Sequence, residues 1–190
     1  MGAPRPLLWL SRANAWFARA AGVVAGALLV AMTTIVGAAV YFRYVANASL
    51  TWSAEATRYL AIWLVFIGAG LAHRWRQHVR IGFLLERLPG RGRHVGELLV
   101  ELIVLVLFVT IGWFGLELGL ANLERNQLSP AMRIPIGWIY FAVPVGFGLA
   151  ALQSLERLLW HGYQLVTGAE LPERPFVSSP DDDLPDEVVG

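Results

Sequence analysis

Four long apolar segments dominate this chain and leave little of it for anything else. They lie at about residues 20–42, 50–72, 98–116 and 134–155. As an α-helix the first would be about 35 Å long, and the hydrocarbon core of a bilayer is about 30 Å thick. Hydrophobic residues make up 56% of the chain and charged residues only 15%. The sequence therefore predicts an all-α integral membrane protein with four transmembrane helices and no soluble domain.

The first apolar segment follows a short basic stretch, residues 1–19, and so has some features of a secretory signal peptide. It is longer than the roughly 7–15 apolar residues of such a signal, and it ends in Tyr41-Phe42-Arg43-Tyr44. We therefore expect an uncleaved first span, with residues 1–19 as a cytoplasmic N-terminal segment.

Arginine placement predicts the orientation of the spans, because cytoplasmic loops are rich in basic residues. The connection between the second and third spans carries six arginines: Arg74, Arg76, Arg80, Arg87, Arg91 and Arg93. The other two connections carry few. We expect this connection and both termini in the cytoplasm. The cytoplasmic tail, residues 159–190, becomes acidic and proline-rich from about residue 170, which predicts disorder there.

The second span is unusual because its uninterrupted apolar part, residues 59–72, would be only about 21 Å long as a helix. Extending it back to Trp52 draws Glu55 and Arg58 into the outer part of the bilayer, where charges are normally paired. We expect Glu55 to pair with Arg58 or Arg43 and to fix helix packing. A polar contact to a partner subunit, or part of an ion path, are the alternatives.

The connection after the second span predicts a short basic amphipathic helix at about residues 79–88. Apolar residues recur at helical spacing and Pro89-Gly90 ends the pattern. Such a helix would lie at the inner membrane interface. A plain extension of the second span into water would leave Leu84, Leu85 and Leu88 exposed.

Candidate chemistry is sparse. There is no cysteine, and no nucleotide loop, nucleophile motif or metal-ligand cluster is evident, so we expect no enzyme, no cofactor and no nucleic-acid partner. Glu97 and Glu101, one turn apart, are expected to form salt bridges at the inner interface. A haem held by His73 with His94 or His161 is the alternative use of the histidines, which otherwise read as solvated interfacial side chains.

The last span has two prolines with different expected effects. Pro135 would lie in the first helical turn, where proline is tolerated, whereas Pro144 would kink the helix at mid-span. Gly146 and Gly148 would allow close approach of a neighbouring helix. Aromatic residues near the predicted span ends are typical of an interfacial belt: Trp16, Trp52, Trp75, Trp138, Tyr44 and Tyr140.

Several short motifs occur in an order that carries a family resemblance. They are Arg43-Tyr44 and Trp52-Ser53-Ala54-Glu55, then Gly68-Ala69-Gly70, then His78-Val79-Arg80 with Leu85–Pro89, and finally Ile134-Pro135 to Trp138 with Val143–Gly146. Over about residues 20–158 the chain resembles the small, four-helix (DctQ-like) membrane subunit of tripartite ATP-independent periplasmic (TRAP) transporters. Ile81-Gly82 departs from the family, whose members often carry an acidic residue after the basic one.

The resemblance implies a non-catalytic permease subunit of the bacterial inner membrane. Its partners would be a large multi-span permease subunit, which carries the substrate and sodium sites, a periplasmic solute-binding protein that delivers an organic acid, and membrane lipid. Glu55, Arg43 and Arg58 would hold spans one and two together, and Arg80 with Leu84 and Leu88 would brace the inner interface. A haem-bearing or structural anchor of a redox enzyme is the alternative. A standalone channel is a third reading, weakened by the lack of polar lining.

Overall fold

The computed structural model describes residues 5–75 and 91–167, and these are helical apart from their connections. The helices are α1 (Arg5–Tyr44), α2 (Ser53–Trp75), α4 (Arg91–Glu124), α5 (Gly137–Tyr140) and α6 (Ala142–Thr167). Four stretches of them are long and apolar enough to cross a membrane. The predicted all-α fold with four spans is therefore confirmed. The predicted interfacial helix at 79–88 and the tail from about residue 170 lie outside the described residues.

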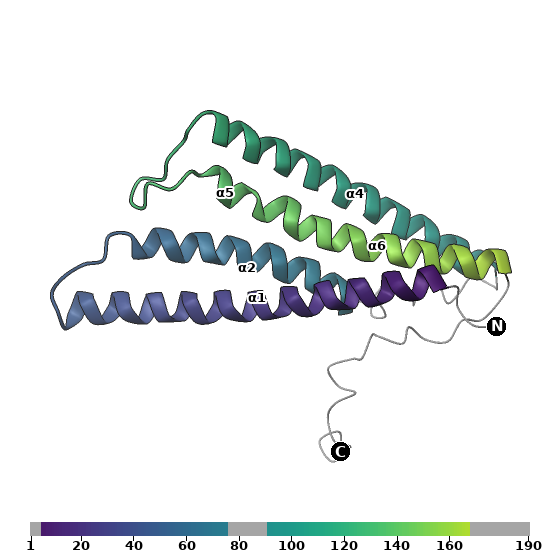
Figure 1. The fold of residues 1–190 in the computed structure, drawn as a ribbon, viewed down its shortest axis with the longest axis horizontal. Coiled ribbons are helices and arrows are strands. Elements are labelled where there is room, and N and C mark those ends of the chain that lie inside the picture. Colours follow the sequence, from purple (N-terminus) through teal and green to yellow (C-terminus); the bar gives the residue numbers. More distant parts are fainter. Residues whose placement is uncertain (1–4, 76–90, 168–190) are drawn as a thin grey trace, which may run out of the picture.

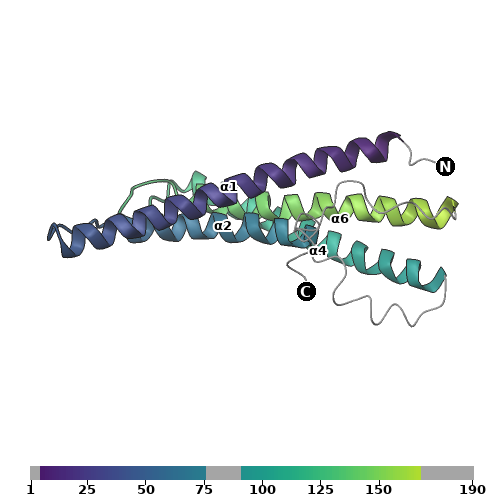
Figure 2. The same ribbon diagram turned by 90° about the horizontal axis from the view of Figure 1, so that it is seen from below.

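The four long helices form an open layer rather than a closed bundle (Figure 1). Helix α6 lies between α4 and α2, and α1 packs on the far side of α2. The backbones of α2 and α4 stay apart, although their side chains meet, as those of His73 and Phe108 do. Seen from below, α1 and α4 diverge on opposite sides of α6 toward the end where α1 begins (Figure 2). Much of the apolar surface of the long helices is therefore left uncovered by the other described residues.

Helix α1 is far longer than the apolar span that it contains. Its 40 residues form a rod of about 60 Å, roughly twice the thickness of a hydrocarbon core. The helix runs without a break through the basic stretch before residue 20. The N-terminal part of α1 thus continues the membrane-crossing helix in the same direction.

The last predicted span is the short helix α5, followed after one residue by the long helix α6. Residues 134–136 precede α5, the regular helix is interrupted at Phe141, whose φ of −64° and ψ of −14° stay helical, and α6 begins at Ala142. Pro135 therefore lies before the helix rather than in its first turn. Pro144 is the third residue of α6 and not at mid-span. A proline has no N–H and its ring obstructs the carbonyl of the residue four positions earlier, here Tyr140, so α5 ends at this point.

The centre of the layer is closed by small residues and phenyl rings. A Cβ added at Gly146 of α6 would lie 2.4 Å from the carbonyl oxygen of Phe66, and one added at Gly70 of α2 would lie 2.7 Å from the carbonyl oxygen of Gly146. Only glycine allows this approach. The predicted close contact at Gly146 is confirmed, whereas a Cβ at Gly148 would meet no described atom of this chain within 4 Å, so for Gly148 the close approach stays a prediction.

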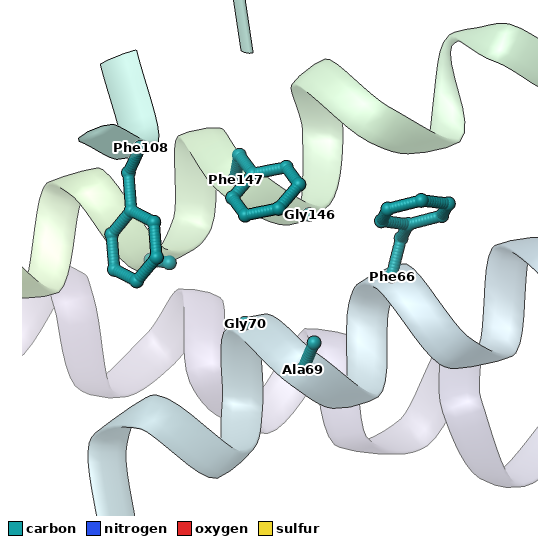
Figure 3. A pocket seen from close by; sticks show the side chains of 7 residues that line it. Phe66, Ala69, Gly70, Phe108, Gly146 and Phe147 are labelled. Carbon is teal, nitrogen blue, oxygen red and sulfur yellow. The ribbon is translucent and has the colours of Figure 1, made fainter. Parts of the chain in front are cut away.

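A small apolar pocket lies beside this crossing (Figure 3). The rings of Phe66 and Phe108 lie 5.9 Å and 5.6 Å from the ring of Phe147, centre to centre. Gly70 and Ala69 form its floor. The lining offers no charged group, so this pocket belongs to the packing of α2, α4 and α6.

Candidate functional site

Polar side chains gather at the two ends of the layer, and Glu55 organises the first of these ends. Its side chain lies in the first turn of α2 and is only 9% exposed. Oε2 accepts hydrogen bonds from the backbone N–H groups of Ala131, at 2.7 Å, and Met132, at 3.0 Å. Oε1 accepts a hydrogen bond from the hydroxyl of Tyr59. Three donors therefore surround one buried carboxylate.

The segment that Glu55 holds is the connection between α4 and α5, which folds as a small hairpin. Leu128 and Pro135 form an isolated antiparallel bridge. The buried Ser129 donates its N–H to the carbonyl of Ile134 at 2.9 Å, and its hydroxyl accepts the N–H of Ile134 at 3.3 Å. Arg133 adopts a φ of +55°, a conformation that costs energy for any residue with a Cβ. The turn of this hairpin, residues 129–134, thus has a defined shape, and Glu55 fixes it to α2.

The expected pairing of Glu55 with Arg43 or Arg58 is wrong. Among the described residues neither arginine forms an ion pair with Glu55, and both are exposed. The guanidinium of Arg43 lies 6.0 Å from the ring centre of Tyr44. The physical reason is that two backbone N–H groups and a phenol already satisfy the carboxylate. Glu55 therefore joins α2 to the 129–132 segment, and not α2 to α1.

Two tryptophans that the sequence analysis assigned to the interfacial belt lie at this end, and the first, Trp138, is on α5. Its ring is exposed, with its centre 5.7 Å from that of Phe141. Trp52, also exposed, precedes α2, and its carbonyl accepts the N–H of Ala56 at 3.0 Å. Both belong to the end of the layer that holds Glu55.

At the opposite end, α1 and α6 are joined through a buried glutamate. The hydroxyl of Ser11 donates to Oε1 of Glu156 at 2.7 Å, and the side-chain amide of Asn14 donates to Oε2. All three side chains are buried. Ser11 and Asn14 lie three residues apart and so share a face of α1. This contact holds the start of α1 against the last turns of α6.

A second polar group at this end joins α2, α4 and α6. Nε2 of His73 lies 3.0 Å from the hydroxyl of Ser154 and 3.3 Å from Nη1 of Arg157. The Arg157 guanidinium also donates to the carbonyl oxygen of His73. Oε1 of Glu101 lies 3.8 Å from both Nη1 of Arg157 and Nε2 of His73. His73 of α2 and Glu101 of α4 thus meet Ser154 and Arg157 of α6 at one point.

Two expectations are decided here. The predicted salt bridge of Glu101 is confirmed, with Arg157 as its partner; the side chain of Glu97 lies outside the described set. The expected solvation of His73 is wrong, because its ring packs edge-on against Phe108 at 4.9 Å and its Nε2 faces Ser154 and Arg157. That nitrogen is therefore occupied by neighbours within the chain.

The remaining predicted site residues fall outside the described chain: His78, Arg80, Leu84 and Leu88. Residues that sequence reasoning missed are Ser11, Asn14, Glu156 and Arg157. A signal for them existed, since Ser11 and Asn14 stand on one face among alanines, and Glu156-Arg157 interrupts an otherwise apolar run. Their partners lie more than 50 positions away in sequence, so the signal could identify the residues but not the contacts.

The arrangement suits packing rather than chemistry. Polar groups occupy the two ends, while the middle is closed by Gly70, Gly146 and the three phenylalanines. Within residues 5–75 and 91–167 no three His, Asp or Glu side chains could hold a metal ion. The buried carboxylates of Glu55 and Glu156 and the half-buried one of Glu101 each face a partner on another helix or loop.

Comparison with known proteins agrees with this geometry. Residues 32–161 match the family described as tripartite ATP-independent periplasmic transporters, DctQ component. The chain belongs to this family. The matched stretch contains Glu55 with the segment that it holds, as well as His73, Glu101 and Arg157. At the level of the family the expectation of a transporter component, and not an enzyme, is confirmed.

Several relatives are permease proteins of TRAP transporters. The ectoine TRAP transporter small permease protein TeaB of Halomonas elongata is 30% identical over 68% of this chain and 66% of its own length. The sialic acid TRAP transporter small permease protein SiaQ of Vibrio cholerae is 28% identical over 70% of this chain and 73% of its own length. The isethionate TRAP transporter permease protein DctMQ of Oleidesulfovibrio alaskensis is 28% identical over 73% of this chain, but the chain spans only 22% of its length.

Proposed function

We propose that this DctQ-family chain is a non-catalytic scaffold for the large permease subunit of a TRAP transporter. The transporter would take up an organic acid delivered by a periplasmic solute-binding protein, with sodium as the coupling ion. The large subunit would carry the substrate and sodium sites. The small chain would stabilise that subunit in the bilayer and help form the outer face that receives the binding protein.

The observation that carries this proposal is that the helices pack tightly against each other at mid-layer, while large apolar side chains face outward from the layer. Where α2 and α6 cross, their backbones are so close that no side chain larger than that of glycine fits at Gly70 or Gly146. The described residues therefore leave little room for a solute between these helices. At the same time, large apolar side chains project outward along α1 and α4. A helical layer of this kind fits a protein that packs against a neighbour.

The size of some relatives supports a large permease partner. The chain spans 22% of the isethionate permease protein DctMQ and 24% of the sialic acid permease protein SiaT of Haemophilus influenzae. In each of those proteins, the region similar to this chain is therefore part of a much longer sequence. We expect a large permease sequence of this kind to be the partner of this chain.

We further propose that both termini face the cytoplasm of the bacterium and that the Glu55 end faces the periplasm. The contact between Ser11 and Glu156 supports a common side for the start of α1 and the end of α6. The arginine-rich connection between α2 and α4 leaves from that same end, as the charge rule for cytoplasmic loops requires.

The experiment is uptake by cells or proteoliposomes that contain the large subunit with and without this chain. We expect uptake and the amount of intact large subunit to fall together when the chain is missing. The affinity of the isolated binding protein for its solute should stay unchanged. Full uptake by the large subunit alone would contradict the scaffold role.

A further inference from the structure

The outward face of α4 carries a row of exposed side chains. Six positions, spaced alternately by three and four residues, form this row, which we call the outer α4 seam: Ile103, Val106, Thr110, Trp113, Glu117 and Leu120. All six are exposed. Steps of three and four in alternation keep side chains on nearly one line of a helix. Because α4 is the last helix at its edge of the layer (Figure 1), this line faces away from α6.

The opposite face of α4 has the same spacing and is occupied by the chain itself. Gly112, Gly115 and Gly119 follow one another at steps of three and four. Cβ atoms added at Gly112 and Gly115 would lie 3.7 Å and 2.5 Å from side-chain atoms of Phe147 and Val143 in α6. Helix α4 therefore has two rows with the spacing of a helix–helix contact, and the described residues cover only one of them.

Contacts between the helices give the depth of the seam in the bilayer. The rings of Phe66 and Phe147 lie 5.9 Å apart, and a Cβ at Gly112 would lie 3.7 Å from Phe147, so Phe66 of α2 and Gly112 of α4 share one level. Glu55 is eleven residues from Phe66 toward one end of the layer, and Glu101 is eleven residues from Gly112 toward the other. Each carboxylate is therefore about 16 Å from this level. The level is the middle of a hydrocarbon core about 30 Å thick.

Two polar side chains of the outer α4 seam thus lie inside the hydrocarbon core. Trp113 is next to the middle, and Glu117 is five residues, or about 8 Å, away from it. Because Cα–Cβ bonds tilt toward the start of a helix, Glu117 leans toward the middle and not toward the nearer end of α4. Among the described residues none forms an ion pair or hydrogen bond with either side chain. Thr110, by contrast, donates to the Val106 carbonyl of its own helix at 2.7 Å.

We propose that the outer α4 seam is the surface on which a helix of the large permease subunit packs, and that this helix brings an arginine or lysine to Glu117. Lipid tails offer no counter-charge to a carboxylate and no acceptor to an indole N–H, and charges at such depth normally face protein and are paired. This inference rests on the proposed scaffold role. It adds to that role the face of the chain that is used and the charge that the partner must carry.

A second copy of this chain fits the same surface poorly. Two copies inserted in the same direction and joined by a two-fold contact would be related by an axis along the membrane normal. Their Glu117 side chains would then meet at one depth inside the hydrocarbon. Like charges repel strongly where the dielectric constant is low, so a partner with a cation at this depth is favoured over a homodimer.

The test measures how much large permease co-purifies with the tagged full chain from native membranes in mild detergent. We expect the ratio of large to small subunit to fall about 10-fold in Glu117→Gln, because the partner's cation would stay unpaired inside the contact. Glu124→Gln is the matched control, since Glu124 is exposed on the same helix but about 18 Å from the middle, outside the hydrocarbon. Circular dichroism checks that both variants keep their helices.

A photo-reactive amino acid in place of Ile103 identifies the neighbour of the seam directly, and we expect an adduct with the large permease. The surface would be overturned by an unchanged ratio in Glu117→Gln, by an equal fall in Glu124→Gln, or by an Ile103 adduct with a second copy or with lipid alone. In each of these cases, co-purification of the permease with the unmodified chain would leave the scaffold role standing. A preparation of the unmodified chain without any large permease would contradict the scaffold role and this inference together.

Discussion

The backbone N–H of Ala131 lies 2.7 Å from Oε2 of Glu55, although the two residues are 76 positions apart. A carboxylate that accepts backbone N–H groups from a turn fixes that turn more firmly than a long, exposed ion pair would. This relationship explains a buried acidic side chain in a transmembrane helix without any conducted ion. It also gives the connection between α4 and α5 a defined shape at the end of the layer where the binding protein is proposed to dock.

Replacing Glu55 by Ala should release that connection. Because the protein has no cysteine, a single reporter such as Ser129→Cys, at a buried position of the turn, can be labelled with maleimide, and its labelling rate measures the opening of the turn. We expect labelling to become several-fold faster in the Glu55→Ala background. Arg58→Ala, an exposed neighbour on α2, is the control and should leave the rate unchanged. Equal rates in all three proteins would show that Glu55 does not hold the turn.

A methyl group at Gly146 should force α2 and α6 apart. The added Cβ would lie 2.4 Å from the carbonyl oxygen of Phe66, and overpacking of this kind costs about 1–3 kcal/mol. Gly148→Ala is the matched control, since its Cβ would meet nothing within 4 Å. Unfolding in mixed micelles should show a loss of stability for Gly146→Ala alone. Similar stability of the two variants would contradict the close crossing.

Removing the carboxylate of Glu156 should loosen the N-terminal part of α1. Ser11 and Asn14 would keep buried donors without an acceptor, and each unsatisfied buried group costs about 1–3 kcal/mol. Hydrogen exchange at residues 9–19 should therefore become faster in Glu156→Ala. Leu159→Ala, at an exposed position of the same helix, should leave that exchange as it is. Protection that survives in Glu156→Ala would show that apolar contacts alone hold α1 in place.

The contact between Glu101 and Arg157 can be measured by a double-mutant cycle with glutamine at each position. Both side chains are mostly buried, and their charged atoms lie 3.8 Å apart. Side chains in one polar network usually show coupling of about 0.5–3 kcal/mol. We expect a favourable coupling in this range from unfolding midpoints of the four proteins. Additive effects would mean that Arg157 acts mainly through the His73 carbonyl.

The sequence predicted the helical segments well but not the partners of the charged side chains. Apolar length and composition determine where helices can cross a membrane, and these are local properties. The partner of Glu55 depends on how a turn some 75 residues later folds back, and no spacing rule contains that information. Arg58, three residues from Glu55, was the nearest charge in sequence and so the natural but wrong choice.

The last span illustrates a different limit. A proline in an apolar run predicts a disturbance, but hydropathy does not say whether the helix bends at Pro144 or stops before it. The structure places the break at Phe141, next to the Tyr140 carbonyl that Pro144 leaves without a helical donor. The short helix α5 before it packs against α4 at Gly119: a Cβ at Gly137 would lie 2.7 Å from the Gly119 carbonyl oxygen. That contact joins residues 18 positions apart, beyond the reach of helical periodicity.

The most direct test of the scaffold role is purification of the tagged chain from native membranes in mild detergent, with co-purifying proteins identified and quantified by mass spectrometry. We predict one larger multi-span permease in equal amount. Its yield should fall in Gly146→Ala and stay normal in Gly148→Ala. Recovery of soluble redox subunits in its place, or of the chain with no partner at all, would contradict the role proposed here.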